Sequence, residues 1–266
     1  MKLLCPICGE ILDRIEKQYR CGNGHSFDLA RQGYVNLLPV QQKRSLNPGD
    51  TREQVLGRRA FLETGCYEPI SNTLNETAKE LGATGPILDV GCGEGYYSAR
   101  LAEALGAELT GLDISKEAVR CAAARYKGPR WLCGTAAHLP VESHSAGVVT
   151  SLFALTMAEE FKRVLRPDGY FFQILAAEDH LLGLKSIIYP ELKFKEKNTV
   201  PEVPGFELVK SVPIRFTFTV EGEQVQNLLG MTPHVFRITK EGAARLAATE
   251  KLTDTASAVL NVYRVV

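Results

Sequence analysis

No stretch of the 266-residue sequence approaches the roughly 18 uninterrupted apolar residues that a membrane-spanning helix needs. The first ten residues, MKLLCPICGE, also lack the apolar region of a secretory signal. There is no internal repeat and no low-complexity tract, and a hydrophobic content of 45% is enough for an ordinary core. These features argue against a membrane protein and predict a globular, cytoplasmic chain with one large and one small domain.

An excess of either charge is absent as well, because 31 Lys and Arg residues balance 31 Asp and Glu residues. Neutrality argues against a nucleic-acid partner, whose phosphates usually require a basic surface. However, residues 1–60 hold ten basic and six acidic side chains, whereas residues 61–266 hold 21 and 25. The basic group that follows the early cysteines comprises Lys43, Arg44, Arg52, Arg58 and Arg59. On charge alone, a solvated linker and helix face is the simpler interpretation.

The cysteines do not indicate a disulfide framework, because there are seven of them and most are scattered. Four residues near the amino terminus have the spacing Cys-x2-Cys-x12-Cys-x3-His: Cys5, Cys8, Cys21 and His25. Two close pairs of such ligands predict a structural zinc site that folds a segment too short to form its own core. Unrelated buried thiols, or a redox pair, are weaker alternatives. The remaining thiols are expected to be small core residues: Cys66, Cys92, Cys121 and Cys133.

The order of segments predicts three units. Residues 1–37 form the zinc-binding unit, residues 38–85 a linker and two helices near 51–65 and 70–81, and residues 86–266 the catalytic domain. In the last unit strand-like runs at 86–91, 107–114, 130–136, 146–153 and 169–175 alternate with helical segments, which predicts a doubly wound parallel sheet. Residues 206–220 are expected to form two strands, 221–229 a helix and 258–266 a last strand.

The sharpest motif is DVGCGEGYY, which runs from Asp89 to Tyr97 between a strand-like and a helical segment. Its glycines, Gly91, Gly93 and Gly95, allow a tight turn close to a ligand at a helix amino terminus. Asp113, at the end of the next strand, can accept both hydroxyls of a ribose. This arrangement resembles the class I S-adenosylmethionine (SAM) methyltransferases. A nicotinamide cofactor or a turn without a ligand fits less well, since the third glycine comes one residue early for a dinucleotide fingerprint.

Thr135 stands where many members of that class place an acid beside the adenine. The contact to the adenine amino group is therefore expected from a hydroxyl or from the backbone.

The whole chain resembles one family, the RlmA group of 23S ribosomal RNA guanine-N1 methyltransferases. The matching stretches include CPIC, GYVNLLPVQ, NPGD, RRAFLETG, DVGCGEGYY, RVLRPDGY, HLLGLKSIIY and LLGMTP. The resemblance implies an α/β class I methyltransferase fold, a Rossmann-like doubly wound sheet, with a small N-terminal zinc-binding domain. It also implies an RNA hairpin as substrate and a homodimer whose zinc units flank an RNA cleft. In some members of the family the modification contributes to macrolide resistance.

The resemblance also implies site residues. The zinc ligands match Cys5, Cys8, Cys21 and His25, and the cofactor site matches Tyr67, Asp89, Gly91, Gly93, Glu94, Gly95, Tyr96, Asp113 and His180. From the residues alone, Tyr67 would be a core residue beside a helix and His180 a surface histidine.

One segment departs from the family pattern. After the fourth strand, members carry Tyr-Ala-Pro-Cys, whereas this chain reads SLFALTMAEE, in which Phe153 is an aromatic that could stack on a flipped base. No catalytic base is identified among His180, Glu178 and Asp179. Two other hypotheses stay open: a methyltransferase for a small molecule, and a zinc-dependent RNA-binding module with an inactive catalytic domain.

Overall fold

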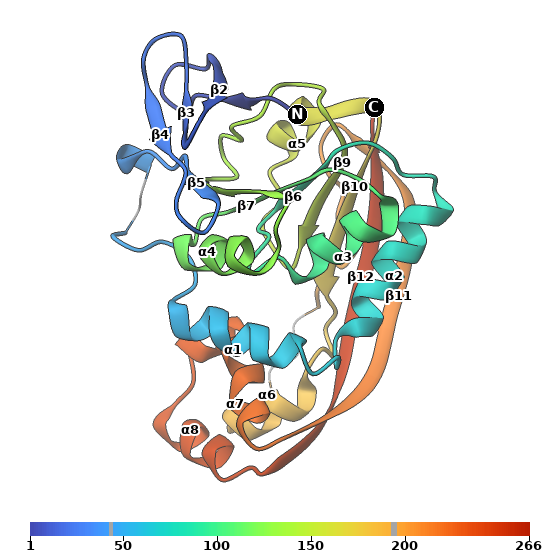
Figure 1. Cartoon of the computed structure of the whole chain (residues 1–266). Helices are drawn as coiled ribbons and strands as arrows, with labels where there is room; N and C mark the ends of the chain where they lie inside the picture. Colours follow the sequence, from blue (N-terminus) through green and yellow to red (C-terminus); the bar gives the residue numbers. More distant parts are fainter. Residues whose placement is uncertain (43–44, 193–195) are drawn as a thin grey trace.

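The computed structural model describes residues 1–42, 45–192 and 196–266, so Lys43 and Arg44 of the basic group lie outside the described residues. The described part of the chain folds into two β-sheets with helices packed around the larger one (Figure 1). The small antiparallel sheet at the amino terminus has the order β1-β2-β3-β4. Its strands are β1 (Leu3–Leu4), β2 (Ile11–Ile15), β3 (Gln18–Arg20) and β4 (Ser26–Asp28).

The large sheet has the order β11-β12-β10-β9-β6-β7-β8-β5. Its parallel part consists of β5 (Tyr34–Asn36), β8 (Arg130–Cys133), β7 (Leu109–Asp113), β6 (Ile87–Val90), β9 (Ala146–Leu152) and β10 (Leu165–Ala176). The chain order reverses beside β6, so the carboxyl ends of β6 and its neighbours meet at a topological switch point, where ligands bind in such sheets.

Helices and the small sheet cover opposite faces of the large sheet. On one face pack α2 (Glu68–Glu80), α3 (Tyr96–Leu105) and α4 (Lys116–Arg125), which bury Leu74, Leu101 and Val119. On the other face α5 (Ala158–Val164) shares a core with the small sheet, whose Cys5, Leu12 and Tyr19 are buried there. The doubly wound α/β fold with an added amino-terminal unit is thus confirmed.

The carboxyl-terminal hairpin corrects one prediction. Residues 206–220 do not form two strands, because β11 (Phe206–Glu221) is continuous and pairs antiparallel with β12 (Lys251–Val265), apart from an irregularity between Leu208 and Lys210. Pro213 suggested a break, but β11 lies at the edge of the sheet, where the missing N–H of a proline costs no ladder hydrogen bond. β12 also begins earlier than residue 258.

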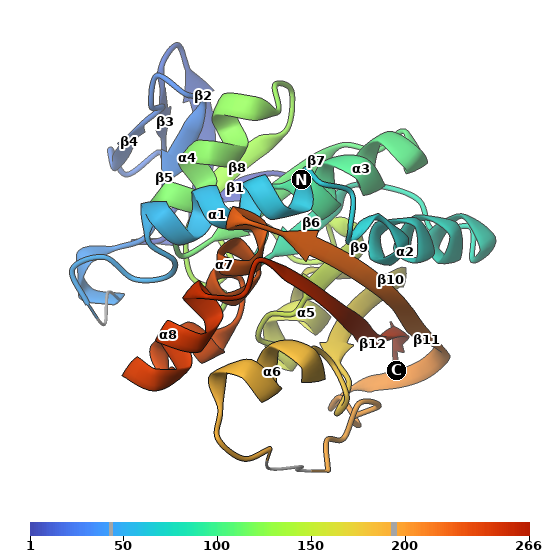
Figure 2. The same ribbon diagram turned by 90° about the horizontal axis from the view of Figure 1, so that it is seen from below.

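The remaining helices gather in a lobe below the carboxyl edge of the sheet (Figures 1 and 2). They are α1 (Arg52–Leu62), α6 (Leu182–Ile188), α7 (Glu223–Gly230), α8 (Lys240–Ala247) and the 3-10 turn η2 (Pro233–Phe236). Another 3-10 turn, η1 (Val40–Gln42), follows β5. No helix in the described part of the chain has the length and apolar character to cross a membrane.

The division into three units stays a prediction. The sheet pairing shows how the first unit is connected to the large sheet. The strand β5 precedes residue 37 but belongs to the large sheet, where Val35 pairs with Leu132 of β8. The amino-terminal unit is therefore joined to the catalytic sheet by hydrogen bonds as well as by the chain.

Candidate functional site

The glycine-rich turn follows β6 as the sequence predicts. Gly91, Gly93 and Gly95 have φ angles of 87°, 56° and 86°, in the region that favours glycine. A Cβ atom on Gly95 would lie 2.6 Å from the ring of Trp131, so a side chain there would displace the helix that starts at Tyr96. The turn thereby presents the amino terminus of α3 to the switch point.

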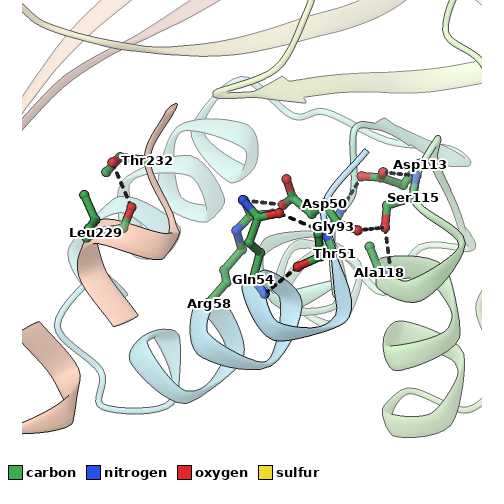
Figure 3. A network of polar contacts seen from close by, with 10 residues as sticks. All are labelled: Asp50, Thr51, Gln54, Arg58, Gly93, Asp113, Ser115, Ala118, Leu229 and Thr232. Atoms are coloured by element: carbon green, nitrogen blue, oxygen red, sulfur yellow. Dashed lines mark hydrogen bonds and ion pairs between the residues drawn. The ribbon is translucent and has the colours of Figure 1, made fainter. Parts of the chain in front are cut away.

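Asp113 connects this turn with the next strand. One carboxylate oxygen accepts the N–H of Gly93 and the other accepts the N–H of Ser115, each at 2.8 Å (Figure 3). Each oxygen keeps a further lone pair. Burial raises the pKa of Asp113, the first cause, while the hydrogen bonds to Ser115 and Gly93 counteract it. Asp113 is thus positioned in the wall of a site with capacity to accept more hydrogen bonds.

A cavity of about 1270 Å³ opens at the switch point. Six of the predicted cofactor residues line it: Tyr67, Gly91, Gly93, Glu94, Asp113 and His180. The other three, Asp89, Gly95 and Tyr96, are not among the described residues that line it. Among these, Asp89 accepts the hydroxyl of Thr150 at 2.6 Å, and burial raises its pKa to about 6. Thr135 also lines the cavity.

Glu94 is buried, with 3% of its surface exposed, and its Oε1 atom has no hydrogen-bond partner among the described residues. Burial raises the pKa of Glu94 to about 7, partly opposed by the positive charge of Arg58. The hydroxyl of Tyr97, which also lines the cavity, lacks a partner in the described structure too. Buried polar atoms are nearly always paired, so these two indicate a polar ligand.

The linker proves to be part of the site. Gln41, Gln42, Gly49 and Asp50 line the cavity. The backbone carbonyl of Asp50 accepts the hydroxyl of Ser115 at 2.7 Å, which ties this segment to the strand end that carries Asp113. Sequence reasoning missed this role, although NPGD stood among the matching stretches.

Arg58 and Arg59, adjacent members of the basic group, have different surroundings. Arg58 lines the cavity, and its guanidinium pairs with Asp50 at 2.6 Å. Arg59 points elsewhere and pairs with Glu63 at 2.9 Å. The solvated helix face that charge alone favoured does not describe Arg58, because its neighbours in the fold are the carboxylates of the cofactor end.

The opposite end of the cavity is aromatic and basic. Phe153 follows β9 with a φ angle of 55°, rare for a bulky residue and typical of functional sites. Its ring stacks on that of His180 with centroids 6.2 Å apart, and 41% of Phe153 remains exposed. Tyr67 contacts His180 edge to face. Lys185, Lys197 and His234 also line this end; sequence reasoning missed them, although HLLGLKSIIY and LLGMTP adjoin or contain two of the three.

The three candidate bases are not equivalent. The Nδ1 atom of His180 accepts the N–H of Ser257 at 3.1 Å, so its proton is on Nε2. Burial lowers the pKa of His180 to about 4, with Lys185 and Lys197 adding to the effect. A neutral ring with this tautomer donates a hydrogen bond from Nε2. Asp179 pairs with Arg215, and neither Asp179 nor Glu178 lines the cavity among its described residues.

The four predicted metal ligands meet in the small sheet, with their ligand atoms all within 4.8 Å of one another. Cys8 Sγ lies 3.7 Å from Cys21 Sγ, and His25 Nδ1 lies 3.4 Å from Cys21 Sγ and 3.6 Å from Cys5 Sγ. Tetrahedral zinc with bonds of about 2.3 Å to sulfur and about 2.0 Å to nitrogen requires edges of about 3.5 to 3.8 Å. The residues therefore fit zinc. Hydrogen bonding, first from the Asn23 side chain, lowers the pKa of Cys8 to about 6, which favours the ligating thiolate.

The other four cysteines differ in burial. Cys92 and Cys133 are buried as expected, but Cys66 and Cys121 are only partly buried. Both of the latter lie outside the cluster of four ligands.

Comparisons with known proteins agree with both halves of the site. The family described as RlmA, N-terminal, a zinc ribbon, matches residues 3–46, and a methyltransferase domain family matches residues 88–173. The 23S rRNA (guanine(748)-N(1))-methyltransferase of Streptomyces fradiae is 32% identical over 256 residues, covering 92% of this chain and 90% of that protein. The chain belongs to the RlmA family of 23S ribosomal RNA guanine-N1 methyltransferases. It is thus a SAM-dependent methyltransferase with an N-terminal zinc ribbon.

Two further matches cover part of the chain. The demethylmenaquinone methyltransferase of Chlorobaculum tepidum is 31% identical over 128 residues, which cover 45% of this chain and 50% of that protein. A solved structure named as a type II methyltransferase from Anaeromyxobacter dehalogenans has a TM-score of 0.51 at 18% identity. It covers 71% of this chain and 95% of its own, and it supports the fold alone.

Proposed function

We propose that this chain transfers a methyl group from SAM to N1 of a guanine in a hairpin of 23S ribosomal RNA. The proposal rests on one cavity whose two ends differ in their lining residues, in a chain that matches a 23S rRNA methyltransferase over 92% of its length. The glycine-turn end offers Glu94 and Asp113 to a cofactor, and the Phe153 end offers an exposed ring to an unstacked base.

In this proposal the cofactor lies in the cavity against the glycine turn and Asp113. Asp113 accepts hydrogen bonds from the ribose hydroxyls. Glu94 and the Tyr97 hydroxyl form hydrogen bonds with other polar groups of the cofactor. Tyr67 and His180 lie beside the methyl group that is transferred. Asp89, Gly95 and Tyr96 support this site from behind rather than contact the ligand. Bound there, SAM supplies a methyl group activated by the sulfonium. Methyl transfer would require the acceptor to lie in line with that methyl group, about 3 to 3.5 Å away.

The other parts of the proposal concern the zinc ribbon. Cys5, Cys8, Cys21 and His25 hold one zinc ion, and the ribbon helps to bind the RNA hairpin. We further propose a cytoplasmic homodimer in which two ribbons flank the RNA. A contribution of the modification to macrolide resistance would depend on which guanine is methylated.

The similarity to demethylmenaquinone methyltransferase keeps a small-molecule acceptor as the competing function. That similarity covers 45% of this chain, whereas the match to the Streptomyces fradiae enzyme covers 92%. A small-molecule reaction would leave the ribbon without a role. An inactive catalytic domain is disfavoured because Asp89, the three glycines and Asp113 are all present.

The test is incubation with labelled SAM and either 23S rRNA that lacks the modification or a panel of quinone acceptors, followed by mass analysis of the products. We expect N1-methylguanosine from the RNA and no labelled quinone. Label in the quinone alone would favour the competing function, and no label in either would favour the inactive module.

A further inference from the structure

Charge is separated along the cavity. The carboxylates that line it, within the described residues, are Asp50, Glu94 and Asp113, and all three lie at the cofactor end, where the charge of Arg58 acts on Glu94 and Asp113. Figure 3 shows Asp50, Asp113 and Arg58 together. The other end is lined by His180, Lys185, Lys197 and His234. The acceptor end thus has two ammonium groups and two imidazoles, with no carboxylate among its described lining residues.

The two lysines are anchored to adjacent carbonyl groups. The Nζ atom of Lys197 donates to the carbonyl of Ala177 at 3.3 Å, and that of Lys185 donates to the carbonyl of Glu178 at 3.4 Å. No ion pair involves either lysine in the described structure. Burial lowers the pKa of Lys185, and the charge of Lys197 lowers it further. Two neighbouring cations, one partly buried (Lys185) and one exposed (Lys197), with no ion pair in the described structure favour an anion beside them.

Other charges near this end do not neutralise it. The Asp254 carboxylate on β12 accepts the N–H groups of Gly183 and Leu184 at 2.9 and 2.7 Å, outside the cavity lining. Asp179 pairs with Arg215 on β11. Burial and the charge of Lys197 lower the pKa of Lys185, and the Asp254 and Glu178 carboxylates oppose them more weakly. Arg237, beside η2, adds positive charge at His234.

The positive charges of Lys185 and Lys197 also act on the buried ring of His180. After burial, Lys185 and Lys197 are the next causes that lower its pKa, so the field opposes a cation at the ring that stacks on Phe153. A field that opposes a cation at this position favours an anion there. Guanine must lose its N1 proton during or before methylation, and the deprotonated base is an anion.

We propose that Lys185 and Lys197 stabilise the N1-deprotonated, anionic form of the target guanine, with His180 donating a hydrogen bond to it from Nε2. This inference rests on the proposed function. The N1–H bond breaks and its proton passes to solvent water, so no side chain serves as the base. The N1 lone pair then takes the methyl group, and the carbon–sulfur bonding pair stays on sulfur, which leaves neutral S-adenosylhomocysteine and N1-methylguanine.

The first test is the pH profile of single-turnover methylation of an in-vitro-transcribed 23S rRNA hairpin that contains the guanine mapped from the wild-type product. The wild-type rate should rise with pH and level off. Lys185→Gln and Lys197→Gln should each shift the rising limb of the profile to higher pH by about one unit. In Lys185→Arg the limb should stay at the wild-type pH. Lys251→Gln, which removes an exposed lysine paired with Glu221 outside the cavity, is the matched control. A wild-type rate that does not vary with pH, or a limb that stays in place in Lys185→Gln, would overturn the inference.

The second test measures binding without turnover. In the presence of S-adenosylhomocysteine, the hairpin should bind more tightly as pH rises, and the double variant Lys185→Gln/Lys197→Gln should lose this dependence. A hairpin that already carries N1-methylguanine has no proton to lose and should show no such dependence with either protein.

Three outcomes separate this inference from its competitors. If the double variant has only a smaller salt dependence of RNA binding, the lysines bind a phosphate and the inference is wrong. If it loses only affinity for S-adenosylhomocysteine, they bind the cofactor carboxylate and the inference is again wrong. If the wild-type protein makes no N1-methylguanosine, the proposed function fails and takes the inference with it, whereas N1-methylation with an unmoved limb overturns the inference alone.

Discussion

Arg58 Nη2 lies 2.6 Å from Asp50 Oδ2, and the guanidinium also approaches the glycine turn, where a Cβ atom on Gly93 would lie 3.4 Å from Nη1 (Figure 3). The pair joins α1 to the segment that closes the cofactor end of the cavity. Arg59, one residue further, pairs with Glu63 outside the cavity. Arg58 and Arg59 can therefore be compared as a test position inside the cavity and a control position outside it.

We expect Arg58→Gln to weaken binding of S-adenosylhomocysteine by about tenfold, or 1.4 kcal/mol, because the three carboxylates at that end lose their only cation among the lining residues described there. Arg59→Gln should change the affinity by less than twofold. Isothermal titration calorimetry on both variants measures the difference. Equal affinities would contradict the role of Arg58 in the cofactor site.

Asp113→Ala should weaken cofactor binding by about 1.5 to 3 kcal/mol, since it removes hydrogen bonds to the ribose. It should also destabilise the cofactor-free protein, because the N–H groups of Gly93 and Ser115 lose their acceptor. Calorimetry and chemical denaturation measure the two effects separately. Arg59→Gln, outside the cavity, serves as the control, and unchanged affinity in Asp113→Ala would refute the assignment.

Glu94 should make the cofactor-free protein less stable as pH rises. Its pKa is raised from an ordinary value near 4.5 to about 7, so the folded protein holds the proton more tightly than the unfolded chain does. Stability from this group is present below pH 4.5 and is lost between about pH 4.5 and 7, by about 3 kcal/mol. Urea denaturation at pH 5 and pH 8 should show a smaller fall for Glu94→Gln than for the wild type. The same fall in both proteins would rule out this effect.

For the metal, we expect about one zinc ion per chain, lost in Cys21→Ser, with the first 37 residues becoming sensitive to protease. Cofactor affinity should persist, because the cavity is lined by no described residue before Gln41. Cys66→Ser, outside the ligand cluster, should retain its zinc. Elemental analysis is the measurement, and zinc-free wild-type protein prepared with zinc present would contradict the assignment.

The zinc ligands and the glycine turn were predictable from the sequence because their signals are local. The spacing of Cys5 and Cys8, or of Gly91 and Gly93, determines a turn whose geometry depends on a few adjacent residues. The carboxyl ends of neighbouring parallel strands also had to meet, which placed Asp113 beside Gly93.

Other features depend on which segments meet in space. Nothing in the composition of residues 38–50 distinguishes a free linker from one that lines a cavity, since Asp50 gains that role through its bond to Ser115 on a distant strand end. Likewise, Pro213 fits within β11 only because that strand lies at an edge of the sheet. Lys185 and Lys197 come from separate segments and are brought together by adjacent carbonyl groups.

The pairing of β5 with β8 has a consequence for the choice of target. Tyr34–Asn36 leaves the zinc ribbon and immediately enters the sheet whose carboxyl edge carries the cavity, while Cys5 and Cys21 pack into the same core as Leu132. The ribbon is therefore held at a fixed distance and angle from Phe153. If the ribbon binds one part of an RNA hairpin, only a guanine at a matching distance along the hairpin can reach the cavity. The length of the stem, and not the base sequence alone, would then decide which guanine is methylated.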